Sequence, residues 1–322
     1  MKAIRVEEQG GPEVMVYRDF GLPPPTPDQV QIKLEAIGVN FRDIYQRSGE
    51  YPMKLPYTPG TEGAGTITAM GEEVTGFSLG DRVGYYGALG AYAEMTNVPA
   101  RRAIKLPDSC AFDQAAAVMG QGTTAHYLVH SCYPLKSGET CLVHAAAGGL
   151  GLLLVQMARR LGATVIGTVS TRAKAEAARA AGCDETIIYT EQDFEAEVRR
   201  ITSGAGVHVV YDSVGKTTFD QSLRCLRRRG YLVLCGQSSG PVPPFNPRVL
   251  NSLGSLYLTR PSGVDYSATR EEMEWRLNDV LSWVASGELT VTIDSTSPLP
   301  QAAEAHVRLA GRATIGKLLL KP

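Results

Sequence analysis

The alternation of apolar and polar positions is most regular in the middle of the chain. Between residues 140 and 236, short apolar runs alternate with segments in which apolar residues recur every three or four positions. The runs predict strands at 140–146, 163–169, 186–189, 207–212, 231–236 and, last, 255–259. The periodic segments predict helices at 150–162, 172–182, 193–204 and 217–230. This repetition predicts right-handed βαβ units and an α/β, doubly wound parallel sheet covered on both faces.

The pattern on either side of this region favours strands. Residues 1–122 hold short β-prone stretches bounded by Gly, Pro and Asp, and the proline-rich segment 22–27 predicts an extended connector. The later part predicts a helix through 269–287, β structure at 290–294, a helix at 301–310 and a final strand at 317–322. We therefore expect a mostly β domain of residues 1–122 and 263–322, completed by the C-terminus folding back, and an α/β domain of residues 123–262.

Composition narrows the class of protein. The 32 lysines and arginines nearly balance the 33 aspartates and glutamates, for a net charge of −1, which argues against a nucleic-acid partner or an anionic membrane surface. The six cysteines show no C-x-x-C spacing, which is typical of buried thiols in a reducing compartment. The charged start is not a signal peptide, and Arg159 and Arg160 interrupt the most apolar stretch. We expect a cytoplasmic protein that does not span a membrane.

A glycine-rich turn follows the first strand of the α/β region. Gly148, Gly149 and Leu150 open the turn, and Gly151 lies at the start of the predicted helix. Glycines at such a strand–helix junction let the pyrophosphate of a dinucleotide approach the N–H groups of the helix start. An ordinary turn is the alternative, but the strand before and the four β/α units that follow favour a dinucleotide site.

The end of the next strand indicates which dinucleotide is bound. NAD sites usually place an acidic residue there to hold the ribose hydroxyls. Here Arg172 and Lys174 occupy this region, and the first carboxylate after Gly148 is Glu176. Basic residues at a helix start are mildly unfavourable unless an anion is bound, by about 0.3–1 kcal/mol, and they can pair with a 2′-phosphate. The sequence therefore predicts NADPH rather than NADH.

These motifs occur together with others over almost the whole chain. They include AIGVNFRDIYQRSGEYP, PGTEGAG, GDRVGYYGALGAYAE, HAAAGGLG, GTVSTRAKAE, VVYDSVG, GSLYLTRPS and ATIGKLLL. With this set the chain resembles the zinc-free branch of the medium-chain dehydrogenase/reductase superfamily, and within it the zeta-crystallin-like quinone oxidoreductases. The resemblance implies a GroES-like β domain, a Rossmann domain, an active site in the cleft between them, and a homodimer formed through the edge strand at residues 254–261.

The resemblance also implies site residues, position by position. Phe41, Asp43 and Tyr45 match the nicotinamide end of the family's site, and Gln121 stands where close relatives often carry lysine. The other matching cofactor positions are Tyr127, Gly149, Leu150, Ser170, Thr171, Lys174, Tyr189, Gln237, Ser238, Pro261 and Gly311.

The residue types predict that no metal is bound. Zinc-dependent members of the superfamily carry cysteine where this chain has Asn40, and Gly-His-Glu where it has Gly60-Thr61-Glu62. Asparagine and threonine are poor zinc ligands beside thiolate and imidazole. Without a Lewis acid, an acceptor that is itself electrophilic is favoured, such as a quinone or an activated enone.

We therefore expect an enzyme that transfers hydride from NADPH to a quinone. Tyr45 and Tyr51 are candidate hydroxyl donors to a substrate oxygen, although each can equally be a packing residue. Asn40 can bond the acceptor or the cofactor ribose, and Thr124 can assist. The alternatives are an NADPH-dependent reductase of enones, 2-haloacrylates or enoyl compounds, and a non-enzymatic NADPH-binding structural or RNA-associated protein.

Overall fold

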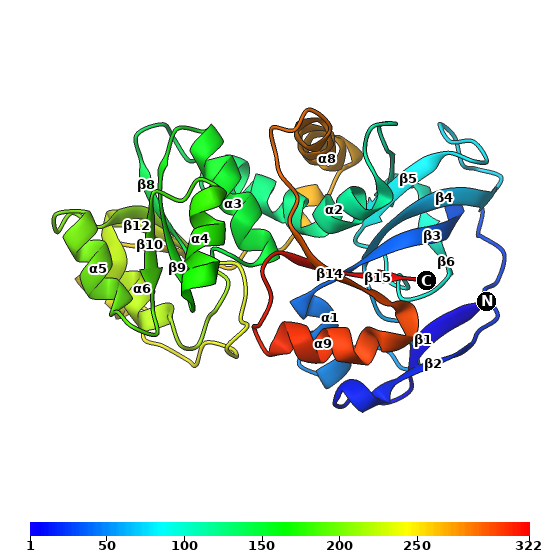
Figure 1. The fold of residues 1–322 in the computed structure, drawn as a ribbon, viewed down its shortest axis with the longest axis horizontal. Helices are drawn as coiled ribbons and strands as arrows, with labels where there is room; N and C mark the ends of the chain where they lie inside the picture. Colours follow the sequence, from blue (N-terminus) through cyan, green and yellow to red (C-terminus); the bar gives the residue numbers. More distant parts are fainter. The chain divides into compact units, whose positions relative to one another are not determined.

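The computed structural model describes all 322 residues, which divide into two compact units (Figure 1). The first unit comprises residues 1–123 and 268–322, and the second comprises residues 124–267. Each unit has its own sheet and its own apolar core.

The second unit is built on a six-stranded parallel sheet in the order β10-β9-β8-β11-β12-β13. Its strands are β8 (Thr140–Val143), β9 (Thr164–Val169), β10 (Glu185–Ile188), β11 (Val207–Asp212), β12 (Leu226–Leu234) and β13 (Tyr257–Thr259). The central strands are buried almost without interruption, as expected for a sheet covered on both faces. The chain order reverses between β8 and β11, which is where parallel sheets bind ligands.

Four helices cover this sheet, two on each face. They are α3 (Gly149–Arg160), α4 (Arg172–Ala180), α5 (Phe194–Ile201) and α6 (Phe219–Cys225). Figure 1 shows α3 and α4 on one side of the strands and α5 and α6 on the other. The doubly wound architecture predicted from the sequence is confirmed. A short helix α7 (Arg248–Ser252), a π-helical turn η3 (Leu128–Cys132) and a 3₁₀ turn η4 (Asp265–Ser267) complete the unit.

One predicted helix of this unit is wrong at its end. The sequence predicts a helix at 217–230, but α6 stops at Cys225 and β12 already begins at Leu226. The partners of β11 jump from Leu226 to Tyr231, so a bulge absorbs the residues between them. Arg229 adopts a positive φ of 56° in this bulge. Pairing of Leu226 with Val207 therefore outweighs the local helical preference of the arginine run.

The first unit is built on a seven-stranded sheet and a separate hairpin. The sheet follows the order β14-β15-β3-β4-β5-β7, with β6 also paired to β3. The strands are β1 (Lys2–Val6) and β2 (Met15–Asp19) in the hairpin, and β3 (Gln29–Val39), β4 (Glu62–Met70), β5 (Arg82–Tyr86), β6 (Met95–Pro99), β7 (Ala103–Lys105), β14 (Ile293–Pro298) and β15 (Lys317–Lys321) in the sheet. Only β14 and β15 pair in parallel. Leu318 of β15 pairs with Val39 of β3, so the C-terminal strand is part of this sheet.

Helices α1 (Phe41–Ser48), α8 (Arg270–Ala285) and α9 (Ala302–Ala310) belong to the first unit, and α2 (Phe112–Tyr127) begins in it. Three 3₁₀ turns, η1 (Pro12–Val14), η2 (Ala100–Arg102) and η5 (Leu299–Gln301), join its elements. Helix α8 starts at the predicted capping box, in which Thr269 accepts a hydrogen bond from the backbone N–H of Glu272.

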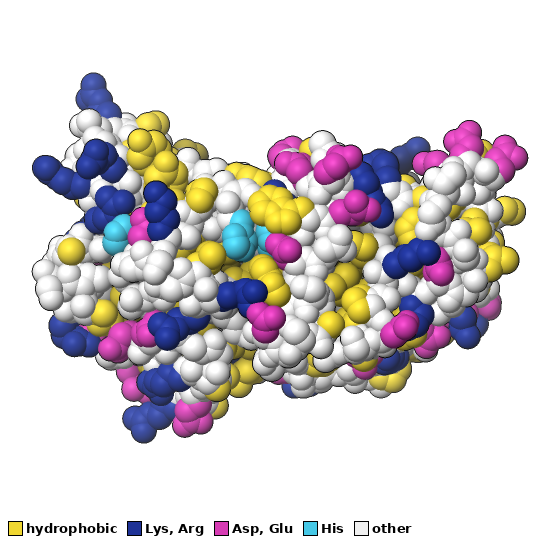
Figure 2. Space-filling view, turned by 90° about the horizontal axis from the view of Figure 1, so that it is seen from above, with side chains coloured by type: hydrophobic (Ala, Val, Ile, Leu, Met, Phe, Trp, Pro, Cys, Tyr) yellow, Lys and Arg dark blue, Asp and Glu magenta, His cyan; other side chains and the backbone are white.

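The surface carries charges of both signs. The face drawn in Figure 2 shows lysines and arginines beside aspartates and glutamates over both units. None of the helices combines the length and the apolar composition of a bilayer-spanning segment.

Candidate functional site

The glycine-rich turn lies at the carboxyl end of β8, where the strand order reverses. Gly148 is the N-cap of α3, and Gly149 and Leu150 are its first residues. A Cβ at Gly151 would lie 2.2 Å from the carbonyl oxygen of Ala145, so only glycine lets the helix pack this closely on the turn. The first turn of α3 carries no acidic residue. The turn therefore fits the diphosphate of a dinucleotide.

A buried polar network supports this turn from below. Ser222 donates a hydrogen bond to Asp212 Oδ2 at 3.0 Å, and its oxygen lies 2.9 Å from His144 Nε2. The other ring nitrogen of His144 lies 2.8 Å from the hydroxyl of Thr168. Burial lowers the pKa of His144, with the charge of Asp212 acting in the opposite direction. A neutral His144 thus ties the end of β8 to β9, α6 and β11.

The predicted adenosine-phosphate residues gather at the carboxyl ends of β9 and β10. Ser170 follows β9, and Thr171 is the N-cap of α4, accepting a bond from the backbone N–H of Lys174 at 3.3 Å. Tyr189 follows β10 and its N–H bonds to the carbonyl of Val169, so it lies beside the end of β9. No acidic residue lies in the first turn of α4.

Basic groups dominate the start of α4. The side chain of Arg172 is 83 % exposed, and its Nε lies 3.9 Å from Glu191, a long and solvated ion pair. Lys174 lies two residues further along the same helix, within its first turn. These residues fit the 2′-phosphate of NADPH, because a phosphate can pair with both cations and with the hydroxyls of Ser170 and Thr171.

Other predicted cofactor residues lie at the carboxyl ends of β12 and β13. Arg260 donates to Gln237 Oε1 at 2.6 Å and to the carbonyls of Gly236 at 2.8 Å and Leu234 at 3.2 Å. Pro261 directly follows Arg260, and Ser238 bonds through its N–H to Ser213. Arg260 therefore fixes the Gln237 side chain, a role that the sequence did not reveal.

Two predicted residues lie on α2 in the second unit. Tyr127 is buried and stacks on Tyr266, with ring centroids 4.7 Å apart and planes 5° from parallel. Thr124 is half-buried one turn earlier. Gly311, in the first unit, is the exposed C-cap of α9.

The first unit holds a buried network around Asn40, the N-cap of α1. Asn40 Nδ2 donates to Glu62 Oε1 at 2.6 Å, and Asn40 Oδ1 accepts from Lys317 Nζ at 2.8 Å and from Gln121 Nε2 at 3.4 Å. Lys317 Nζ also lies 2.5 Å from Glu62 Oε1. The second carboxylate oxygen of Glu62 accepts from the N–H of Gly120 at 2.5 Å. The polar atoms of Asn40, Glu62 and Lys317 at the tips of their side chains thus all have partners within one compact cluster.

Sequence reasoning named Asn40 but missed Lys317. It treated Glu62 only as part of a replaced zinc motif. A lysine within the apolar strand 317–322 was the available signal, since a charged residue there must be paired when the strand is buried. Asn40 Oδ1 and Glu62 Oε1 both accept hydrogen bonds from the ammonium of Lys317. No group of three or more His, Cys, Asp or Glu side chains is arranged to hold a metal ion.

The aromatic candidates lie on and after α1. The ring centroids of Tyr45 and Tyr51 are 5.2 Å apart, and those of Phe41 and Tyr45 are 6.1 Å apart. The N–H of Tyr51 bonds to the carbonyl of Tyr45 at 2.9 Å. Tyr45 is buried, whereas Phe41 and Tyr51 are half-buried. The structure therefore brings the two candidate hydroxyl donors together as one aromatic cluster.

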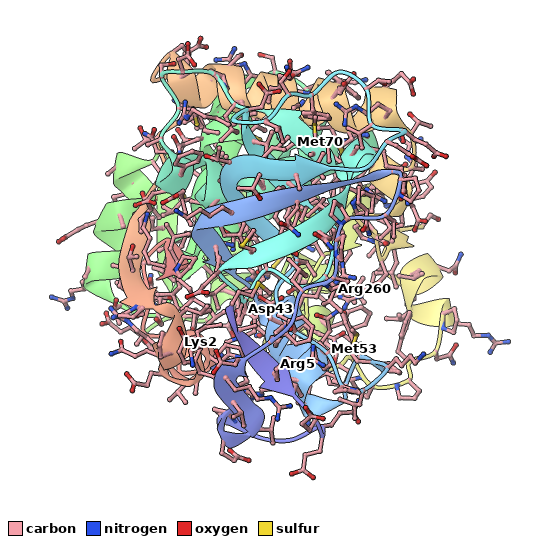
Figure 3. All side chains as sticks on the ribbon, turned by 90° about the vertical axis from the view of Figure 1, so that its right-hand side faces the viewer. Lys2, Arg5, Asp43, Met53, Met70 and Arg260 are labelled. Atoms are coloured by element: carbon pink, nitrogen blue, oxygen red, sulfur yellow. The ribbon has the colours of Figure 1, made fainter.

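Asp43 lies inside the first unit (Figure 3) and supports Asn40 from the backbone side. Its Oδ2 accepts from the N–H of Asn40 at 2.9 Å and from the hydroxyl of Tyr92 at 3.1 Å. The Tyr92 oxygen lies 2.9 Å from His306 Nε2, and Arg47 lies 3.3 Å from His306 Nδ1. Asp43 therefore holds the N-cap residue Asn40 in place at the start of α1.

Burial sets the charge states of this second network. Burial raises the pKa of Asp43 to about 7, opposed by the hydrogen bond from Asn40. Burial, with the nearby charge of Arg47, lowers the pKa of His306 to about 3. Both groups are therefore held neutral over part of the pH range in which they ionise in an unfolded chain.

The comparisons with known proteins cover both units. The family described as "Zinc-binding dehydrogenase" matches residues 149–279, and that described as "Alcohol dehydrogenase GroES-like domain" matches residues 26–108. A quinone oxidoreductase of Pseudomonas aeruginosa is 45% identical over 100% of this chain and 99% of its own length. A 2-haloacrylate reductase of a Burkholderia species is 43% identical over 98% of both chains. The crystal structure of Escherichia coli quinone oxidoreductase complexed with NADPH superposes with a TM-score of 0.98, at 44% identity over 100% of both chains.

Proposed function

The chain belongs to the quinone oxidoreductase family of medium-chain dehydrogenases and reductases, and on this premise we propose that it reduces quinones with NADPH and without a metal. The observation that carries the proposal is the end-to-end similarity to quinone oxidoreductases, at 45% identity over 100% of the chain. The basic start of α4 and the glycine-rich turn before α3 support the choice of cofactor.

We assign the binding of NADPH to the residues at the carboxyl ends of the parallel strands. The N–H groups at Gly149 and Leu150 hold the diphosphate, and Ser170, Thr171, Arg172 and Lys174 hold the 2′-phosphate. Stacking and hydrogen-bonding contacts come from Tyr189, Gln237, Ser238, Pro261 and Tyr127, and a further contact comes from Gly311. NADPH, when bound, supplies the hydride.

The residues around α1 are proposed to handle the acceptor. Asn40 donates a hydrogen bond to the acceptor oxygen, Tyr45 or Tyr51 supplies a hydroxyl to the same region, and Thr124 assists. Phe41 packs against the Tyr45 ring and keeps water from the aromatic cluster. A quinone needs no Lewis acid because it is already electrophilic, which suits a centre whose cation is the ammonium of Lys317.

A reductase of 2-haloacrylates or other enones is the second candidate. It is favoured by the Burkholderia relative, which is nearly as similar as the quinone oxidoreductases. Both reactions need the same cofactor, but an enone must also receive a proton on carbon.

A panel assay separates the candidates. The purified protein is mixed with NADPH or NADH and with benzoquinones, naphthoquinones, enones or 2-haloacrylates, and loss of the reduced cofactor is followed by absorbance. The proposal requires the highest kcat/KM with NADPH and a quinone. A higher kcat/KM with 2-haloacrylates would establish the second candidate, and NADPH binding with no turnover of any acceptor would establish a structural protein.

We also propose a cytoplasmic homodimer. The six cysteines are all free and most are buried, which suits a reducing compartment. Strand β13 pairs only with β12 and leaves its other edge open, and Tyr257 on it is 50 % exposed. An open edge of this kind is a natural place for a second copy to extend the sheet.

A further inference from the structure

We propose that Lys317 is a positioning residue of the reaction centre, which together with Glu62 holds the Asn40 amide with one N–H directed at the acceptor oxygen. The inference deepens the proposed function and rests on it. It starts from the ion pair of Lys317 and Glu62, whose side chains are 2 % and 0 % exposed.

The pair is held in place from several elements. Gly120 of α2 donates its N–H to Glu62 Oε2. A Cβ at Gly38 of β3 would lie 2.3 Å from Glu62 Oε1, so the carboxylate occupies the space that a side chain would fill. Lys317 is the first residue of β15, and two residues later in that strand Leu319 pairs with Gly38 of β3. Because two strands and a helix surround the charges, neither side chain can turn toward solvent without repacking.

The charges leave Asn40 only one orientation. Its Oδ1 faces the ammonium of Lys317 at 2.8 Å, and its Nδ2 faces the carboxylate of Glu62 at 2.6 Å. Turning the amide by 180° would set donor against donor and acceptor against acceptor. Gln121 adds a second donor to Oδ1, and Asp43 holds the backbone N–H of Asn40. The geometry of the amide is therefore dictated by charge rather than by packing alone.

This orientation has a chemical consequence. The side-chain amide nitrogen of Asn40 carries two hydrogens. One of them is donated to Glu62 Oε1, so the other can bond an acceptor oxygen. The ammonium on Oδ1 polarises the amide and strengthens its N–H as a donor. Two-electron reduction of a quinone by hydride leaves negative charge on that oxygen until a proton from solvent neutralises it. A fixed, polarised donor stabilises this charge without reorganising first.

The same arrangement explains how a buried ammonium can act in this site without adding net charge to it. The carboxylate of Glu62 balances the ammonium of Lys317, so the pair adds a local dipole but no net charge. The positive end of this dipole lies at the Asn40 amide oxygen and the negative end at the amide nitrogen. The structure thus points to Lys317 as the group that sets the donor strength of Asn40.

The test uses the full-length protein and two altered forms of the pair. Lys317→Met removes the ammonium and keeps much of the stem. The double variant Lys317→Met, Glu62→Gln removes both charges. It leaves no unpaired charge in the core, so we expect it to fold even if the single variant does not. Lys321→Met, on the same strand but paired to Asp113 on α2, is the matched control. Circular dichroism and thermal unfolding establish that each protein is folded.

Three readouts are compared with those of the wild type. They are kcat and KM for a benzoquinone, the Kd for NADPH from fluorescence titration, and the ¹⁵N–¹H resonances of the Asn40 side-chain amide, assigned with Asn40→Asp. We expect kcat of the double variant to fall about 10- to 100-fold with KM and the NADPH Kd within about twofold. The Asn40 amide resonances should shift, because their hydrogen-bond partners have changed.

The opposite results overturn the inference. A folded double variant whose kcat stays within about twofold of the wild type shows that the pair is structural only. Unmoved Asn40 amide resonances show that Lys317 does not orient the amide. Failure of the wild type to reduce any quinone overturns the proposed function instead. The amide resonances of NADPH-free protein then still decide whether Lys317 positions Asn40.

Discussion

Glu62 Oε1 and Lys317 Nζ lie 2.5 Å apart, although 255 positions of sequence separate the two residues. The contact arises because β15 and β4 flank β3 on opposite sides, and Gly38 of β3 leaves a gap between them. The ion pair is thus a product of sheet topology. Its burial makes it important both for stability and for the geometry of Asn40.

Removing one member of this pair is expected to destabilise the fold strongly. Lys317→Met leaves the carboxylate of Glu62 buried without its cation, and we expect the free energy of unfolding to fall by about 3–5 kcal/mol. Lys317→Met, Glu62→Gln should recover most of this loss, because neither charge remains. Urea unfolding of both variants measures the difference. Equal losses in the two would mean that the charge imbalance is not the cause.

A substitution at Gly38 tests how tightly the backbone of β3 packs against the carboxylate of Glu62. An added Cβ in Gly38→Ala collides with Glu62 Oε1 at 2.3 Å, so the carboxylate or the strand must move. We expect a loss of about 1–3 kcal/mol in unfolding free energy. Gly21→Ala is the control, because nothing lies within 4 Å of its added Cβ. A Gly38→Ala protein as stable as Gly21→Ala would show that β3 yields easily there.

Asp43 and His306 are expected to change stability with pH in opposite directions. The raised pKa of Asp43, about 7 against 3.8 in a model compound, means that unfolding releases a proton between these values, so its contribution falls as pH rises. The lowered pKa of His306, about 3 against 6.5, means that unfolding binds a proton between these values, so its contribution increases with pH. Between about pH 4 and 6.5 the two effects oppose each other.

Single variants should separate these contributions. Asp43→Asn should make the unfolding free energy rise with pH relative to the wild type, by up to about 1.4 kcal/mol per pH unit, and His306→Gln should make it fall by a similar slope. Urea unfolding at several pH values in this range gives the slopes, with the exposed Asp220→Asn as control. Three parallel profiles would show that neither group has a shifted pKa.

The basic start of α4 should decide between the two dinucleotides. Arg172→Ala combined with Lys174→Ala removes both charged partners of a 2′-phosphate. We expect the Kd for NADPH to rise about 10- to 100-fold while the Kd for NADH changes by less than about twofold. Arg179→Ala, in the last turn of the same helix, is the control. Fluorescence titration measures the Kd of each variant for each cofactor. An equal rise in the Kd for NADPH and for NADH would show that Arg172 and Lys174 do not bind the 2′-phosphate.

The open edge of β13 should determine the oligomeric state. We expect the wild type to have twice the chain mass of 34.6 kDa in light scattering. Tyr257→Lys places a charge on the exposed edge and should yield single chains. Val264→Lys is the control, since Val264 is also 50 % exposed and lies outside the strand. A dimer that survives Tyr257→Lys would have to use another surface.

The sequence by itself determined the second unit and its turn. Strands and helices there alternate with clear periodicity, and Gly148 to Gly151 form a turn whose requirements are local. The basic residues Arg172 and Lys174 were readable for the same reason, because they follow a strand directly. Local pattern failed at Arg227 to Gly230, where pairing of Leu226 with a distant strand overrides the helical preference of the arginines.

Only the tertiary structure decided what surrounds Asn40. Its partners Glu62, Gln121 and Lys317 come from β4, α2 and β15, and no periodicity relates them. The charge state of Asp43 likewise depends on its burial, on the hydrogen bond from the Asn40 backbone and on the charges of Glu62 and Lys317 from other strands. Hydrogen bonds and ion pairs act over a few ångströms, so their members become known only when the chain has brought distant strands together.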